Sequence, residues 1–141
     1  MTTVATIVQA EPEAYVRTAC LWVKRNRASF KRLMHLCHRE VDRGNPVIQR
    51  GDIYNLARRA GFDITECDEL RRNNNLWAPL ARYMVMLRPR LAKSLHFRKA
   101  GCDEVDMQAI WRELVNAETV FLASSWQEAK RACEDGCVCA A

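Results

Sequence analysis

The sequence predicts an all-α protein: one compact domain of six or seven helices. Apolar residues recur at three- and four-residue steps and alternating strand-like runs are scarce, which indicates helices. The chain has 141 residues, of which 49% are hydrophobic, and contains 5 Gly and 4 Pro. It can bury a core of its own, and collagen-like, low-complexity and wholly disordered chains are excluded. We expect residues 1–10 to be a loose lead-in, residues 11–135 the helical domain and residues 136–141 a flexible, cysteine-containing tail.

Each helix in the first half has a start or a stop signal. The first is expected to begin near Pro12, because a proline suits a first helical turn. The second has the clearest apolar stripe, and Gly44 followed by Asn45 and Pro46 ends it. Its stripe residues are Phe30, Leu33, Met34, Cys37 and Val41. A third helix is predicted over residues 52–60, and pairs of these helices could form a helix-turn-helix.

Sequence signals in the second half of the chain predict the remaining helices. Asn74 or Asn75 should cap a helix that Pro89 breaks. Further helices are expected over residues 90–99 and 107–117. Ser125 to Glu128 matches a capping box for a last helix that ends near Gly136. Residues 62–66 or 99–105 leave room for a small hairpin wing.

Charge is distributed unevenly along the chain, whose formal net charge is +5. Residues 17–99 carry 19 Lys and Arg against 7 Asp and Glu, whereas residues 100–141 carry 3 against 8. A basic body with an acidic C-terminal part attracts polyanions such as nucleic acid, or acidic protein faces. The alternative is that these cations are ordinary solvated helix faces.

The most basic segment, residues 71–99, contains eight Lys and Arg and no acidic residue. Cations held together repel one another, and phosphates would relieve that repulsion and release counterions. The competing interpretation is that some of them pair with acids of the C-terminal part and stabilise the fold. Arg82, which stands mid-helix among apolar neighbours, is expected to be such a partly buried anchor.

The predicted nucleic-acid surface combines this segment with the helix over residues 52–60. Asn and Arg side chains suit base edges and phosphates, and an exposed Trp77 could stack on a base. The three consecutive asparagines would supply donors at a helix start. The expected contact residues are Arg50, Tyr54, Asn55, Arg58, Arg59, Arg71, Arg72, Asn73, Asn74, Asn75, Trp77, Arg88, Arg90, Lys93 and Arg98. We expect DNA rather than RNA as the partner.

Other chemistries have little support in the sequence. Cys133, Cys137 and Cys139 form one loose cluster, with Cys102 or His96 as the fourth ligand, and lack the paired ligand units of a structural zinc site. No phosphate-binding glycine loop, nucleophile elbow or paired-carboxylate site is present, and nothing in the sequence orients His96 toward Cys102. We therefore expect no enzyme activity, no cofactor and no metal.

The location is expected to be the cytoplasm. The first ten residues lack the basic and apolar regions of a signal peptide, and no apolar run is long enough to span a membrane. The seven cysteines are then expected to be reduced thiols, and their odd number argues against a complete disulfide framework.

One spaced motif resembles a known family. Asn73-Asn74-Asn75, five residues, Ala81-Arg82, six residues, Pro89 and then Phe97-Arg98 is similar to the signature of an uncharacterised family of small helical proteins encoded by bacteriophages and prophages. The helix around Ile53 and the Phe62-Asp63-Ile64 stretch fit the same layout. The resemblance covers residues 30–99 and departs in the longer interval from Pro89 to Phe97 and in the extra C-terminal helices. It implies a mobile-element or bacterial cytosolic origin and no particular mechanism.

The sequence thus favours a nucleic-acid-binding protein of phage or mobile-element type that contacts phosphates through a basic helical face. One alternative is a phage-type inhibitor that binds and blocks a host protein, in the manner of an anti-defence or anti-CRISPR protein. Another is a virion or assembly component.

Overall fold

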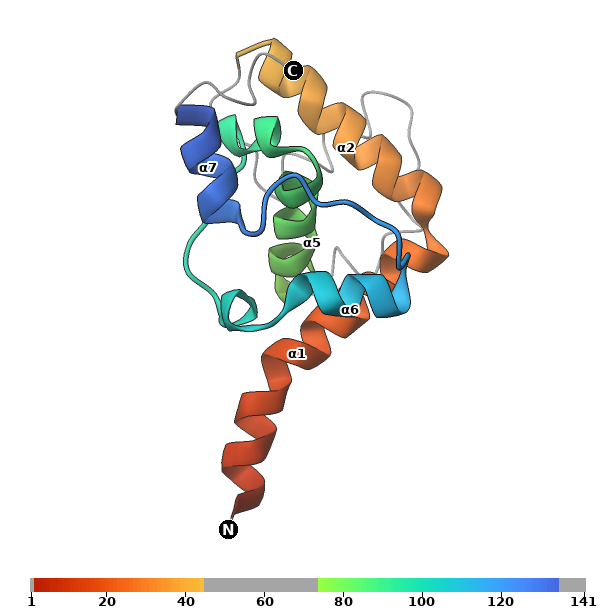
Figure 1. Cartoon of the computed structure of the whole chain (residues 1–141), viewed down its shortest axis with the longest axis vertical. Helices are drawn as coiled ribbons and strands as arrows, with labels where there is room; N and C mark the ends of the chain where they lie inside the picture. Colours follow the sequence, from red (N-terminus) through yellow and green to blue (C-terminus); the bar gives the residue numbers. More distant parts are fainter. Residues whose placement is uncertain (1, 45–73, 135–141) are drawn as a thin grey trace.

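The computed structural model describes residues 2–44 and 74–134, which form an all-α fold around a central helix (Figure 1). The predicted fold class is confirmed. These residues contain five α-helices and two 3-10 helices, fewer than the six or seven helices expected. In chain order they are α1 (Thr2–Arg25), α2 (Arg27–Asp42), α5 (Asn74–Leu87), η2 (Pro89–Lys93), η3 (Gly101–Glu104), α6 (Met107–Leu114) and α7 (Trp126–Glu134). The helix predicted over residues 52–60, the turn of a possible wing at residues 62–66 and the tail at 136–141 lie outside the described residues.

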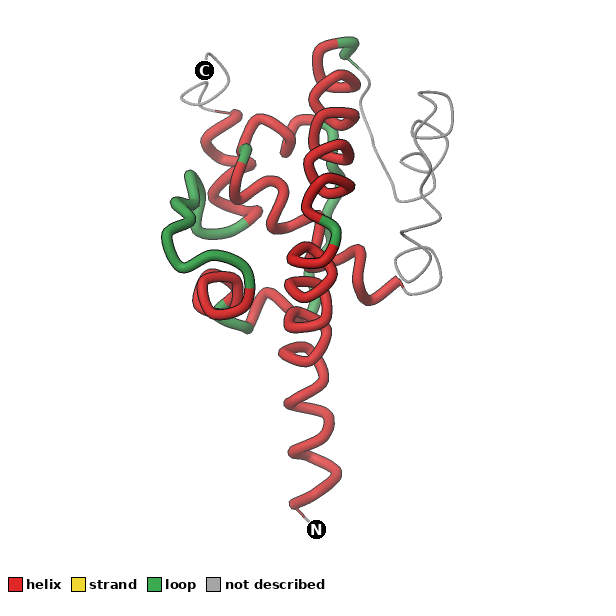
Figure 2. Tube along the Cα trace, turned by 90° about the vertical axis from the view of Figure 1, so that its right-hand side faces the viewer, coloured by secondary structure: helices red, strands yellow, loops and turns green. Residues whose placement is uncertain are grey.

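Helix α1 begins at Thr2 and continues through Pro12, so the predicted start near Pro12 is wrong. Its first turns extend away from the body of the molecule, while its second half packs against α5 and α6 (Figures 1 and 2). Pro12 lies where α1 meets η3, and a Cβ placed on Gly101 would come within 2.8 Å of Pro12 Cγ. The glycine therefore allows the proline-bearing turn to approach η3 closely.

Helix α2 matches its prediction. Phe30, Leu33, Cys37 and Val41 are buried, and Met34 is half-buried at the edge of the same stripe. Gly44 follows the helix with a φ of 75°, a left-handed conformation that favours glycine and ends the helix. The apolar side of α2 faces the core, and its polar side faces solvent.

Helix α5 is the core element and is buried on nearly all sides from Leu76 to Met86. The Tyr83 hydroxyl donates a hydrogen bond of 2.6 Å to the carbonyl of Met107 and accepts one from the thiol of Cys20 at 3.2 Å. The Tyr83 ring also lies 4.8 Å from the Trp111 ring, centroid to centroid. One side chain thus joins α5 to both α1 and α6.

Residues 90–99 do not form the predicted α-helix. Pro89 opens the short 3-10 helix η2, and residues 96–100 have no helical structure. The wing predicted at residues 99–105 is also wrong, because η3 occupies that position. There the carboxylate of Asp103 accepts a hydrogen bond of 3.0 Å from the N–H of Ala100, which closes the chain into a helical turn.

The last two helices begin where capping residues predict. Asp106 accepts a hydrogen bond from the N–H of Ala109 at the start of α6, which ends at Leu114, earlier than expected. Ser125 accepts one from the N–H of Glu128 at the start of α7. Between these helices the chain crosses α5, where the N–H groups of Leu122 and Ala123 both donate to the carbonyl of Met86, at 2.9 and 3.1 Å. Among the described helices, none has the length and apolar character needed to cross a bilayer.

Candidate functional site

Most of the predicted contact residues cannot be placed. Arg50, Tyr54, Asn55, Arg58, Arg59, Arg71, Arg72 and Asn73 lie outside the described residues. Asn74 and Asn75 stand in the first turn of α5, at the predicted helix start. Trp77 is half-buried and packs against the hydrophobic core, so it is not the exposed ring that was expected.

Arg82 is a structural residue, as its mid-helix position predicted. Its side chain is only 4% exposed, and its Nε donates a hydrogen bond of 2.7 Å to Asp103. The remaining guanidinium nitrogens donate to the carbonyls of Ala78 and Arg98, and the group lies over the rings of Phe97 and Trp126. These contacts satisfy most of the hydrogen-bond donors of Arg82 within the fold, so this cation has a structural role.

The other described cations of the predicted surface differ in whether their charges are already paired within the protein. They are Arg88, Arg90, Lys93 and Arg98. Arg90 is half-buried and forms an ion pair with Asp42 of α2, so its charge is largely matched. Arg88 is exposed and donates to the carbonyl of the preceding residue at 2.9 Å. Lys93 and Arg98 are exposed as well. In the described ranges, none of these last three side chains forms an ion pair.

Arg88 belongs to a groove between α2, the end of α5 and the segment that follows α6. Two cations of α2, Arg27 and Lys31, line the same groove, which has a volume of about 280 Å³. We call these three residues and the apolar side chains beneath them the cationic groove. Its floor consists of Val23, Phe30, Met34, Leu87 and Trp111, and Thr119 completes its lining.

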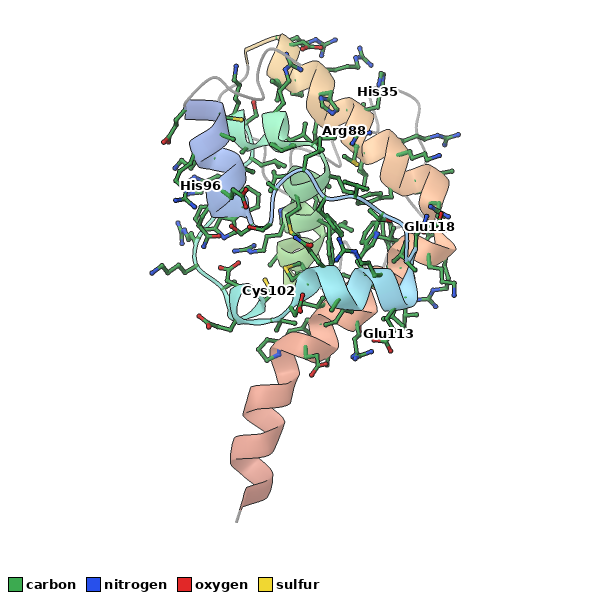
Figure 3. All side chains as sticks on the ribbon, in the orientation of Figure 1. His35, Arg88, His96, Cys102, Glu113 and Glu118 are labelled. Carbon is green, nitrogen blue, oxygen red and sulfur yellow. The ribbon has the colours of Figure 1, made fainter. Side chains whose placement is uncertain are left out.

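The cations of the groove are not neutralised within the described part of the protein. Arg27, Lys31 and Arg88 are all exposed, no carboxylate is among the described lining residues, and none of the three forms an ion pair there. Arg27 and Lys31 stand four residues apart on α2, a spacing at which like charges destabilise a helix. The nearest acidic residue along the lining segment is Glu118, which precedes Thr119 and lies near the α1–α2 junction (Figure 3).

The charges of nearby arginines also act on His38 of α2. Partial burial lowers the pKa of His38, and the charges of Arg90 and then Arg88 lower it further, whereas Asp42 raises it. Figure 3 shows His35 and Arg88 together beside α2, while His96 and Cys102 lie away from this face, beside α7 and η3. The charges that act on His38 therefore come from Arg90, Arg88, Asp42 and His35.

Sequence reasoning did not identify Arg27 or Lys31 as site residues. The only available signal was their four-residue spacing on the polar side of α2. The floor residues gave none, because Phe30 and Trp111 look like ordinary core positions in the sequence. The groove forms only where the fold brings α2 together with the end of α1, the end of α5 and α6.

A second cavity, of about 330 Å³, lies beside the Arg82–Asp103 pair and includes Cys102 and Trp126 in its lining. Burial raises the pKa of the Cys102 thiol, which keeps it protonated and weakly nucleophilic. The described residues contain no cluster of three or more His, Cys, Asp or Glu side chains able to hold a metal ion. Cys137 and Cys139 lie outside those residues.

Comparison of the chain with protein-family models, with curated proteins and with solved structures found no match.

Proposed function

We propose that this protein binds nucleic acid, with DNA preferred, by contacting phosphates at the cationic groove. The observation that carries the proposal is the convergence of three exposed cations, Arg27, Lys31 and Arg88, on one groove without a lining carboxylate among the described residues. The surface predicted from the sequence, over residues 50–59 and 71–98, lies largely outside the described residues. Of its described cations Arg90 is paired with Asp42, and Arg88 is the one that lines the groove.

The physical reason is the relief of charge repulsion. Two arginines present planar donor groups that can hold phosphate oxygens in pairs, and Lys31 adds a compact charge to the same groove. A polyanion that binds here neutralises the three cations and releases the counterions it carried, which is favourable at low salt. The phage or mobile-element origin remains part of the proposal and rests on the resemblance carried by the Asn73 to Arg98 motif, and a cytoplasmic location remains part of the proposal as well.

The test compares two charge-matched double variants. Arg27→Gln/Lys31→Gln removes two cations of the groove, and Lys130→Gln/Arg131→Gln removes one exposed Lys and one exposed Arg from α7. Binding of labelled DNA is measured by fluorescence anisotropy over a range of salt concentrations. The groove variant should bind at least about tenfold more weakly, and the slope of log K against log salt should fall by about 2, one for each lost phosphate contact.

The control variant should bind almost as the unaltered protein does. Equal losses in both variants would mean that only net charge matters, and wild-type binding that does not change with salt would exclude phosphate contacts. Circular dichroism of each variant confirms that its helices remain folded.

A second candidate function, binding to a host protein, is favoured by one observation. Val120 and Leu122, in the segment that contributes Thr119 to the groove, are 74% and 59% exposed. Large apolar side chains this exposed are typical of protein-binding surfaces when they gather with others. The test is whether the protein captures one stoichiometric host protein from a nuclease-treated lysate. This function would be supported instead if the variant Val120→Ser/Leu122→Ser no longer captured that protein.

A further inference from the structure

Phosphate binding alone does not require the apolar floor of the cationic groove. Contacts to a duplex backbone need only cations, whereas here Arg27, Lys31 and Arg88 line the same groove as Phe30, Met34, Leu87 and Trp111. We infer that the groove takes one unpaired base of a single strand, with the adjacent phosphates on the three cations. This inference rests on the proposed function and specifies its ligand.

Ring contacts and a hydrogen bond fix the aromatic side chains in the floor of the groove. The rings of Phe30 and Trp111 have centroids 5.9 Å apart, and the Trp111 ring also packs against Tyr83 and Phe121. The Trp111 indole N–H donates a hydrogen bond of 2.9 Å to the hydroxyl of Thr119. Since these side chains are fixed before a ligand arrives, little conformational entropy is lost when a base packs on them.

Met34 and Leu87 form the accessible part of the floor. Both are half-buried and pack against the core, whereas Phe30 and Trp111 are 5% and 4% exposed. A flat base that enters the groove would therefore contact mainly the thioether of Met34 and the side chain of Leu87. A polarizable thioether contacts ring systems favourably.

The size of the groove favours a single base. Its volume of about 280 Å³ is small for a ligand site, and bases within a duplex are stacked and paired where such a groove cannot reach them. A single strand exposes its bases at no unpairing cost, and the combination of a basic track with apolar contacts is typical of single-strand binding.

Only one polar side chain without a charge lines the groove among the described residues. The Thr119 hydroxyl accepts the hydrogen bond from Trp111, which leaves its own proton available to an acceptor on a base edge. One donor distinguishes bases poorly. We therefore expect the binding to depend weakly on base identity.

The experiment uses the whole chain and three labelled DNA probes of equal length: a thymine single strand, a strand that is abasic at every position, and a duplex. The abasic strand keeps every phosphate, so it separates base contacts from charge. At one salt concentration the intact strand should bind at least about tenfold more tightly than either of the other two, the effect of losing about one stacked base.

Each other outcome has a definite meaning. Equal, salt-sensitive binding of all three probes would overturn the base inference and leave the proposed function intact. Binding of none would overturn both. Displacement of the intact strand by a polyglutamate peptide as readily as by unlabelled strand would mean that the groove takes an acidic protein segment, which also overturns the inference.

A pair of variants tests the floor directly. Met34→Ala removes its thioether, and Leu21→Ala, on an exposed position of α1, is the matched control for apolar truncation. Met34→Ala should weaken binding of the intact strand several-fold and leave the abasic strand unaffected, while Leu21→Ala changes neither. If Met34→Ala weakened binding of the intact and the abasic strand equally, the variant would have changed the folding of the protein or its phosphate contacts. That result would contradict the inference.

Discussion

Arg82 and Asp103 form a buried ion pair that joins the centre of α5 to the turn before α6. The Nε of Arg82 lies 2.7 Å from Oδ1 of Asp103, and the two side chains are 4% and 15% exposed. Asp103 also accepts hydrogen bonds from the N–H of Ala100 and from the indole of Trp126 at 3.1 Å. The pair thus connects α5, η3 and the first turn of α7 through one carboxylate.

Breaking this pair should destabilise the fold strongly. Arg82→Met keeps most of the side-chain volume but leaves a buried carboxylate without its cation, which costs about 3–5 kcal/mol. Lys99→Met, at an exposed position close in the chain, is the matched control and should change the free energy of unfolding little. Urea denaturation of both variants measures the difference, and equal stabilities would show that the pair contributes nothing.

The same carboxylate predicts the pH dependence of stability. Burial opposes the ionisation of Asp103, but hydrogen bonds from Arg82 and the N–H of Ala100 outweigh it, so its pKa in the folded protein is lowered. The stabilisation is therefore fully present above the unfolded-state pKa of about 3.9 and is lost as the pH falls through the lower folded-state pKa. Asp103→Asn should be less stable near neutral pH and should lose less stability on acidification. Denaturation midpoints measured from neutral to acidic pH check this, and parallel curves for both proteins would contradict it.

Gly101→Ala should destabilise the contact between η3 and α1. The added Cβ would lie 2.8 Å from Pro12 Cγ, too close for two carbon atoms, and both sides of the contact are parts of rings or backbone that cannot turn away. Overpacking of this kind costs about 1–3 kcal/mol. In a double-mutant cycle, Pro12→Ala should recover part of the loss caused by Gly101→Ala, whereas strictly additive effects would show that the two residues do not interact.

His38 should report on ligand binding at Arg88. Its pKa is lowered by partial burial and by the charges of Arg90, Arg88 and His35, with Asp42 acting in the opposite sense. Phosphates that neutralise Arg88 should raise this pKa, so the protein should bind nucleic acid more tightly as the pH falls below the ordinary histidine pKa of about 6.5. Proton NMR of the His38 ring should show its pKa rise when a DNA strand is added. His38→Gln should reduce the pH effect on binding, and His96→Gln, on the other side of the molecule, should not.

Local sequence signals predicted local structure well. The stripe of α2, the stop at Gly44 and the cap at Ser125 are each encoded within a few residues, and each is found where expected. The long start of α1 was missed because residues 2–10 carry no capping signal and because Pro12 usually marks a first turn. The helix expected over residues 90–99 failed because tertiary contacts around Arg82 hold that segment in another conformation.

The candidate site was predictable only in part. Arg88 was named from the basic run around it, but which cations remain unpaired depends on Asp42 and Asp103, which stand 48 and 21 positions from their arginines. No local pattern contains that information. Arg27 and Lys31 became candidates only when α2 was seen to lie beside the end of α5, because an exposed basic helix face has the same sequence pattern whether or not a groove borders it.

The buried thiols of Cys20, Cys37 and Cys102 can be used to measure local unfolding of the protein. Burial raises the pKa of Cys20 to about 11 and that of Cys37 to about 12, so thiol-specific reagents find almost no reactive thiolate at these two positions while the protein is folded. Each of the three lies on a different element: Cys20 on α1, Cys37 on α2 and Cys102 on η3. The order in which they become alkylated, read by mass spectrometry of the peptides, would reveal which of these segments detaches first from the central helix.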